Sequence, residues 1–141
     1  EHAGALNNLQ LFFGDVMMET NIKRFVNFHL SCQPDATIAV QRNRNPDDAD
    51  LVEMNGQNKI TAFYPKPHPP GMDKLGNAAL YVLTKKILRH ADLGCCCDLA
   101  IDIMPRALKA GDTILGYRTN EYLVDIGTPE RLATARQECV A

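Results

Sequence analysis

The sequence lacks the features that mark nucleic-acid-binding proteins, membrane proteins and secreted proteins. Its 15 lysines and arginines stand against 17 aspartates and glutamates, a net charge of -2 in 141 residues. This balance, without a polybasic run, indicates neither a nucleic-acid nor a membrane partner. The apolar runs are far too short to cross a bilayer, and none resembles a signal peptide. We therefore expect a cytoplasmic protein.

Several common catalytic signatures are missing as well. Three of the five cysteines are consecutive, at 95–97, and their spacing matches no zinc-binding pattern, so we expect reduced thiols. There is no Walker-type loop and no Gly-x-Gly-x-x-Gly loop. The four histidines are scattered and suggest no catalytic triad. The chemistry must therefore come from other residues.

The hydrophobic pattern predicts alternating strands and helices. Strands are expected at 9–13, 36–41, 51–54, 59–64, 75–83, 113–118 and 121–125, and helices at 20–29, 84–90, 98–112 and 129–139. Pro105 should kink the third helix or begin a new one. The turn of the hairpin 51–64 uses either Asn55-Gly56 or the three residues 56–58. This order favours an α/β fold with a mixed, mainly parallel sheet flanked by helices.

Two acidic residues end predicted strands. Asp15 follows the apolar run 9–13, and Asp125 ends the run 121–125, before a Gly-Thr-Pro segment that predicts a turn and a helix start. Ligands of α/β proteins bind at such strand ends. Each acid alone could serve only its own turn. Together they suit Mg²⁺, which binds one or two carboxylates and substrate phosphates.

Two further polar residues are candidates for substrate binding. Lys66 lies in the segment 65–71, in which four of seven residues are proline, so little backbone entropy is lost when the lysine meets a phosphate. Asn77 begins an apolar strand, where its amide could bind a sugar hydroxyl. The alternatives are a solvated surface lysine and a structural asparagine.

Five phrases, in this order, resemble the sugar-phosphate nucleotidyltransferase family. They are "AGAL" at 3–6, "FFGDV" at 12–16, "ITAFYPKP" at 60–67, "NAALYVL" at 77–83 and "DIGTPERL" at 125–132. The resemblance implies a Rossmann-like fold and an enzyme that joins a nucleoside triphosphate to a sugar 1-phosphate and releases pyrophosphate. Residues 1–141 would then be the C-terminal portion of a single nucleotidyltransferase domain.

The resemblance also assigns roles to individual residues. It implies that Asp15 and Asp125 hold Mg²⁺ and act in catalysis together with Lys66, which contacts the sugar phosphate. It implies that Asn77 contacts the sugar. The "AGAL" phrase implies that Ala3 and Gly4 line the base, and Gly14 of the Gly-Asp phrase joins the substrate-binding residues.

Two departures from the family pattern point to a subgroup. Pro65 stands where the family commonly has glutamate, and Ala79 stands where it has glycine. In both departures the chain resembles a subgroup similar to mannose- and heptose-1-phosphate guanylyltransferases. Some members of that subgroup are fused to a haloacid-dehalogenase-type phosphatase. This subgroup implies GTP and a manno-configured sugar, and it leaves open a homo-oligomer and a fused phosphatase domain.

The glycine-rich triphosphate loop of the family would lie upstream of Ala3, and the chain begins at Glu1, without methionine. We therefore expect an N-terminally truncated domain that is inactive alone. Two other hypotheses remain open. One is a non-catalytic regulatory or nucleotide-sugar-binding subunit, which the two retained acids disfavour. The other is an α/β binding module in which all four polar residues are structural.

Overall fold

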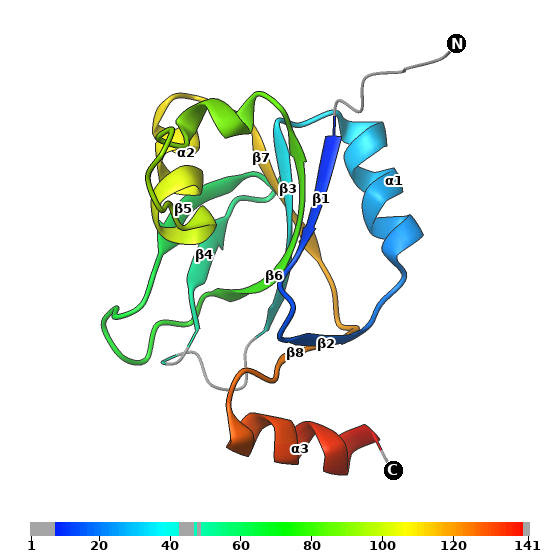
Figure 1. Ribbon diagram of the computed structural model, residues 1–141. Coiled ribbons are helices and arrows are strands. Elements are labelled where there is room, and N and C mark those ends of the chain that lie inside the picture. The colour runs from blue at the N-terminus through cyan, green and yellow to red at the C-terminus, as the bar shows by residue number, and fades with distance from the viewer. Residues whose placement is uncertain (1–7, 43–46, 48, 140–141) are drawn as a thin grey trace.

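The computed structural model describes residues 8–42, 47 and 49–139 as two sheets and their covering helices (Figure 1). The elements, in chain order, are β1 (Asn8–Phe12), β2 (Val16–Glu19), α1 (Ile22–Cys32), β3 (Ala36–Arg42), β4 (Leu51–Met54), β5 (Ile60–Tyr64), β6 (Leu75–Thr84), the 3₁₀ helix η2 (Ile87–His90), the π-helix η3 (Leu99–Ile103), α2 (Met104–Lys109), β7 (Ile114–Arg118), β8 (Tyr122–Asp125) and α3 (Pro129–Cys139). None of the described helices combines the length and the apolar character that a membrane span requires.

The larger sheet is mixed, and antiparallel pairing prevails in it. Its strand order is β5-β4-β6-β3-β7, with β1 pairing to β6. The α/β fold with a mixed sheet and flanking helices is confirmed, but the expected prevalence of parallel pairs is wrong for the described strands. Among them only β3 and β7 are parallel. Parallel neighbours need a long crossover connection, whereas the hairpin β4–β5 and the loop before β6 return the chain directly.

Most predicted elements form for the expected local reasons. The Asn21 side chain accepts a hydrogen bond from the Arg24 amide and so caps α1. The hairpin uses the three-residue turn 56–58, in which Asn58 adopts a φ of 62°. Pro105 falls in the first turn of α2, after the π-helical turn η3, and so begins a helix. The strand β2, which pairs with β8, was not expected.

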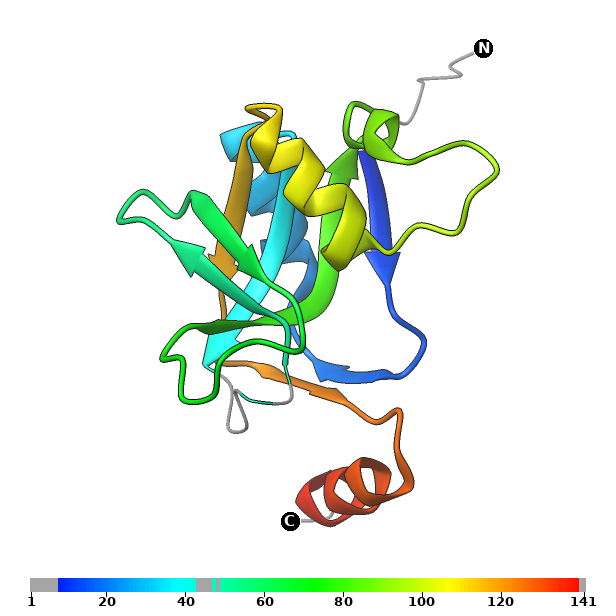
Figure 2. The ribbon, with the colours of Figure 1, turned by 90° about the vertical axis from the view of Figure 1, so that its left-hand side faces the viewer.

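Helices cover both faces of the larger sheet. Figure 2 shows α2 in front of the strands and α1 behind them. Alternation along β3 sends Ile38 and Val40 into the core beneath α2, and Ala39 toward the core beneath α1. From α1, Phe25 packs into the second core, and buried His29 pairs its Nδ1 with the Thr37 hydroxyl at 2.8 Å.

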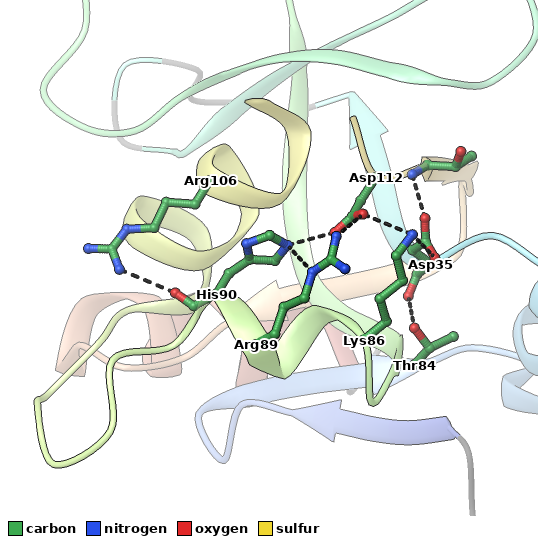
Figure 3. Close-up of polar contacts among 8 residues, drawn as sticks. Asp35, Thr84, Lys86, Arg89, His90, Arg106 and Asp112 are labelled. Atoms are coloured by element: carbon green, nitrogen blue, oxygen red, sulfur yellow. Dashed lines mark hydrogen bonds and ion pairs between the residues drawn. The ribbon is translucent and has the colours of Figure 1, made fainter. Parts of the chain in front are cut away.

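An ion network ties the strand ends together on the side of the sheet where β3 and β7 begin (Figure 3). Asp112 is only 2% exposed and lies 2.9 Å from Lys86 Nζ, 2.7 Å from Arg89 Nη2 and 2.6 Å from His90 Nε2. Lys86 also reaches Asp35, which precedes β3. Burial acts to raise the pKa of Asp112, but hydrogen bonds from Lys86 and His90 hold that pKa below its ordinary value.

A bulge interrupts β6 toward the end of the sheet that is opposite the Asp112 ion network. Ile38 pairs with Tyr81 and Val40 with Asn77, so the single residue Ala39 of β3 stands opposite three residues of β6, 78–80. Ala79, inside the bulge, adopts a φ of 56°. On its other edge β6 pairs with β1 over residues 80–84 and with β4 over residues 75–76. The bulge therefore marks the point at which β6 changes neighbours.

We predict that Ala79→Gly stabilises the chain by about 1 kcal/mol. Glycine removes the steric cost of a Cβ in the left-handed conformation, and this gain exceeds the loss that results from the greater conformational entropy of glycine in the unfolded chain. Equilibrium unfolding in urea would measure the change. The matched control is Ala78→Gly, at a buried neighbour outside the left-handed region, which should destabilise. Equal losses in both variants would contradict the strain at Ala79.

Candidate functional site

Four of the predicted site residues line one cavity of about 760 Å³. They are Asp15, Lys66, Asn77 and Asp125. The cavity lies where the β2–β8 sheet meets the bulged part of β6 and the segment 65–71. Gly14 precedes Asp15 but is not among the lining residues, and Ala3 and Gly4 lie outside the described residues.

The two carboxylates converge because β2 and β8 are paired. Val16 lies opposite Asp125 in this antiparallel pair, so Asp15 stands one residue beyond the pairing. The Ile126 amide donates to the Asp15 carbonyl at 2.7 Å and extends the contact between the two strands to Asp15. A Cβ placed on Gly127 would lie 2.8 Å from Asp15 Oδ2 and 3.1 Å from Asp125 Oδ1. A glycine at 127 thus lets both carboxylates occupy the same small space.

Arg131 is a cavity residue that sequence reasoning missed. Its Nη1 lies 2.6 Å from Asp125 Oδ2, while Asp125 Oδ1 accepts a hydrogen bond from the Gly127 amide at 2.7 Å. The arginine stands six residues after the acid, on α3. The available signal was this spacing across a predicted helix start, which places a residue of the first helical turn beside the strand end.

The carboxylate pair fits a hard divalent cation. Within residues 8–42, 47 and 49–139, no group of three or more histidine, cysteine, aspartate or glutamate side chains is arranged to hold a metal ion. A cation at Asp15 and Asp125 would therefore complete its coordination with water and phosphate oxygens, as Mg²⁺ commonly does. It would also compete with Arg131 for Asp125 Oδ2.

Asn77 is held in one orientation on the other side of the cavity. Its Nδ2 donates to the Tyr81 hydroxyl at 2.6 Å, and its Oδ1 accepts from the Ala79 amide at 3.1 Å. Tyr81 is 1% exposed, and this burial raises the pKa of its hydroxyl, which therefore stays neutral. An amide has two N–H donors and two carbonyl lone pairs, so these two bonds leave capacity for a ligand.

Lys66 reaches the cavity from the proline-rich segment. Its backbone amide donates to Asp50 Oδ1 at 3.0 Å, and Asp50 also lines the cavity. Sequence reasoning missed Asp50 and also Gln41, whose Nε2 donates to the Leu123 carbonyl at 2.7 Å and joins β3 to β8. These contacts connect segments far apart in the chain, so spacing gave no signal for them.

The chain as a whole matches the model of a known protein family. The model of that family, described as nucleotidyl transferase, matches residues 3–140. The chain belongs to this family. The match covers nearly the whole chain, so the resemblance seen in the five phrases is confirmed.

Individual relatives place the chain among sugar-phosphate nucleotidyltransferases. It is 30% identical to a mannose-1-phosphate guanylyltransferase of Mycobacterium tuberculosis, over 91% of this chain and 36% of the relative. It is 27% identical to a glucose-1-phosphate adenylyltransferase of Clostridium perfringens, over 89% of this chain and 34% of the relative. The chain thus spans about a third of the length of these relatives.

A solved structure supports the fold. HddC from Yersinia pseudotuberculosis superposes with a TM-score of 0.76 at 20% identity, over 96% of this chain and 56% of HddC. At this identity the likeness establishes the fold alone. The nucleotide-sugar transferase type of α/β fold, expected from the sequence, is confirmed.

We predict that Gly127→Ala weakens divalent-cation binding about tenfold or more without unfolding the chain, because the new Cβ forces the two carboxylates to turn aside and the productive ligand geometry is lost. Mn²⁺ binding, followed by electron paramagnetic resonance, would measure the loss. Gly56→Ala is the control, since no atom lies within 4 Å of a Cβ there. Unchanged Mn²⁺ affinity in Gly127→Ala would refute the convergent site.

Proposed function

We propose that the protein containing this chain transfers a nucleotidyl group from a nucleoside triphosphate to a sugar 1-phosphate and releases pyrophosphate. The observation that supports this most is the gathering of two convergent carboxylates, a lysine and an oriented amide on one cavity. Asp15 and Asp125 would hold Mg²⁺, which would neutralise negative charge at the substrate phosphates.

The residues act by positioning and by charge. A phosphate oxygen of the sugar 1-phosphate attacks the α-phosphorus in line, the bond to the β-phosphate oxygen breaks, and pyrophosphate leaves, so no covalent enzyme intermediate is required. Lys66 donates to the attacking phosphate and reduces its repulsion from the triphosphate. Asn77, already oriented by Tyr81 and Ala79, binds a sugar hydroxyl.

GTP and a manno-configured sugar are the preferred substrates in this proposal. Support comes from the mycobacterial relative, a mannose-1-phosphate guanylyltransferase, and from HddC, which has also been solved complexed with GMP-PN. Pro65 and Ala79 add the subgroup resemblance. Because another relative is an adenylyltransferase of glucose 1-phosphate, the base and the sugar must be tested together.

Pyrophosphate release by the full-length protein tests the proposal. We expect release with Mg²⁺, GTP and a mannose- or heptose-type 1-phosphate, and less with ATP or glucose 1-phosphate. Asp125→Asn should lower the rate about 100-fold or more, because the variant lacks one anionic metal ligand. Removal of Mg²⁺ with a chelator should abolish release, and we expect none from the isolated 141 residues.

Asp92→Asn is the matched control, since Asp92 forms a surface pair with Arg106 and does not line the cavity. Its rate should equal that of the unmodified protein. If no nucleoside triphosphate and no sugar 1-phosphate gives pyrophosphate, the non-catalytic regulatory subunit becomes the better hypothesis. The Asp125–Arg131 pair would then be a structural neutralisation of the acid.

A further inference from the structure

The segment 65–71, which carries Lys66, is attached to Asp47, Ala49 and Asp50 by hydrogen bonds that involve side chains. Four of its seven residues are proline and offer no amide donor, so a ladder of backbone bonds cannot hold it. Three bonds make this attachment: Lys66 N to Asp50 Oδ1 at 3.0 Å, Gly71 N to Asp47 Oδ1 at 3.0 Å, and His68 Nε2 to the Ala49 carbonyl at 2.9 Å. We call this set of contacts the loop clamp.

His68 differs from the other clamp residues because both of its ring nitrogens face carbonyl oxygens. Nε2 lies 2.9 Å from the Ala49 carbonyl, and Nδ1 lies 3.2 Å from the carbonyl of Pro69. A carbonyl can only accept, and a neutral imidazole has a single N–H. Both contacts are therefore satisfied as hydrogen bonds only when the ring is an imidazolium.

The surroundings of His68 favour that charged form. The hydrogen bonds to the Ala49 and Pro69 carbonyls raise the pKa of His68, and the negative charges of Asp47 and Asp50 raise it further, against a smaller opposing effect of burial. These two acids are the ones that bind the neighbouring amides of the same segment. The clamp therefore carries two negative charges with the histidine's positive charge between them.

We propose that protonated His68, together with Asp50, is a positioning residue that holds Lys66 at the cavity, and that loss of the His68 proton loosens the segment 65–71. The identity of the anion that meets Lys66 rests on the proposed function, whereas the clamp itself does not. Neither His68 nor Asp50 touches the reacting atoms in this proposal; both act through the lysine.

The direction of the pH effect follows from the raised pKa. Such a histidine contributes its stabilisation in full below its ordinary pKa, and that stabilisation is lost as the pH rises through the pKa of the folded state. The clamp should thus be closed in mildly acidic solution and should open toward alkaline pH. Lys66 would then be less well placed for phosphate, which affects substrate binding more than the rate of the bound complex.

Amide hydrogen exchange of Lys66 and Gly71 tests the clamp without any substrate. In His68→Gln we expect protection of both amides to fall about tenfold at about pH 6, since a bond from a charged donor is worth roughly that factor. The ratio of unmodified to variant protection should approach one at about pH 8.5, where the native ring is neutral. Taking a ratio cancels the intrinsic pH dependence of exchange.

His90→Gln is the matched control, because His90 belongs to the Asp112 network and not to the clamp. In this variant the protection of the Lys66 and Gly71 amides, compared with that of the strand amides, should not change. Nitrogen NMR of the histidine rings gives the second readout, with both His68 nitrogens protonated at about pH 6.5. A His68 midpoint at or below the ordinary value, or equal protection in His68→Gln at acidic pH, would overturn the proposal.

Kinetics of the full-length protein then separate the clamp from the proposed function. The KM for sugar 1-phosphate should rise about tenfold in His68→Gln at about pH 6.5 with kcat nearly unchanged, and the difference from the unmodified protein should vanish as the pH increases. An unchanged KM overturns the positioning role. Absence of turnover in the unmodified protein counts against the proposed function alone, and exchange and NMR still decide the clamp.

Discussion

The bulge in β6 is the constraint on which the cavity depends. One edge of β6 pairs with β3 along its length. Along the chain, the other edge pairs first with β4, before the bulge, and then with β1, after it. The change of partner on this edge coincides with the bulge, where the extra residues interrupt the ladder and bend the strand. The two residues inserted opposite β3 let β1 and β4 separate, and the cavity opens at that separation. Asn77 and Tyr81 flank the bulge and are joined across it by their hydrogen bond, so the same irregularity that opens the cavity also orients a polar group within it.

The cavity has two sides that are built independently. The acidic side belongs to the small sheet, where the β2–β8 pairing and Gly127 bring Asp15 and Asp125 together. The other side belongs to the larger sheet and holds Asn77 and Lys66. On the acidic side, Arg131 neutralises part of the negative charge through its ion pair with Asp125.

Sequence patterns predicted the parts of this arrangement that local chemistry determines. The acids at the ends of the first and last predicted strands, the lysine among prolines and the asparagine at the start of a strand all lie on one cavity. Most helices and strands also formed where periodicity and capping residues placed them. These features depend on residues close in the chain, so a single sequence carries their signal.

What the sequence did not reveal depends on contacts between distant segments. The strand β2 has only four residues and exists because β8 pairs with it. The excess of antiparallel pairs depends on how the chain returns after the hairpin, which hydrophobic periodicity does not encode. The left-handed conformation of Ala79 was hidden because alanine gives no sign of positive φ, although the glycine usual in the family at this position is suited to it.

The loop clamp explains how the lysine-bearing segment 65–71 is held against Asp47, Ala49 and Asp50. Asp47 and Asp50 accept hydrogen bonds from the Gly71 and Lys66 amides, and the segment 65–71 has few amides to offer because four of its seven residues are proline. Asp47, Ala49 and Asp50 supply the hydrogen-bond acceptors, and the segment 65–71 supplies the donors. The clamp contacts lie apart from the β2–β8 pairing that brings the two carboxylates together, so a change in the lysine-bearing loop need not disturb Asp15 and Asp125.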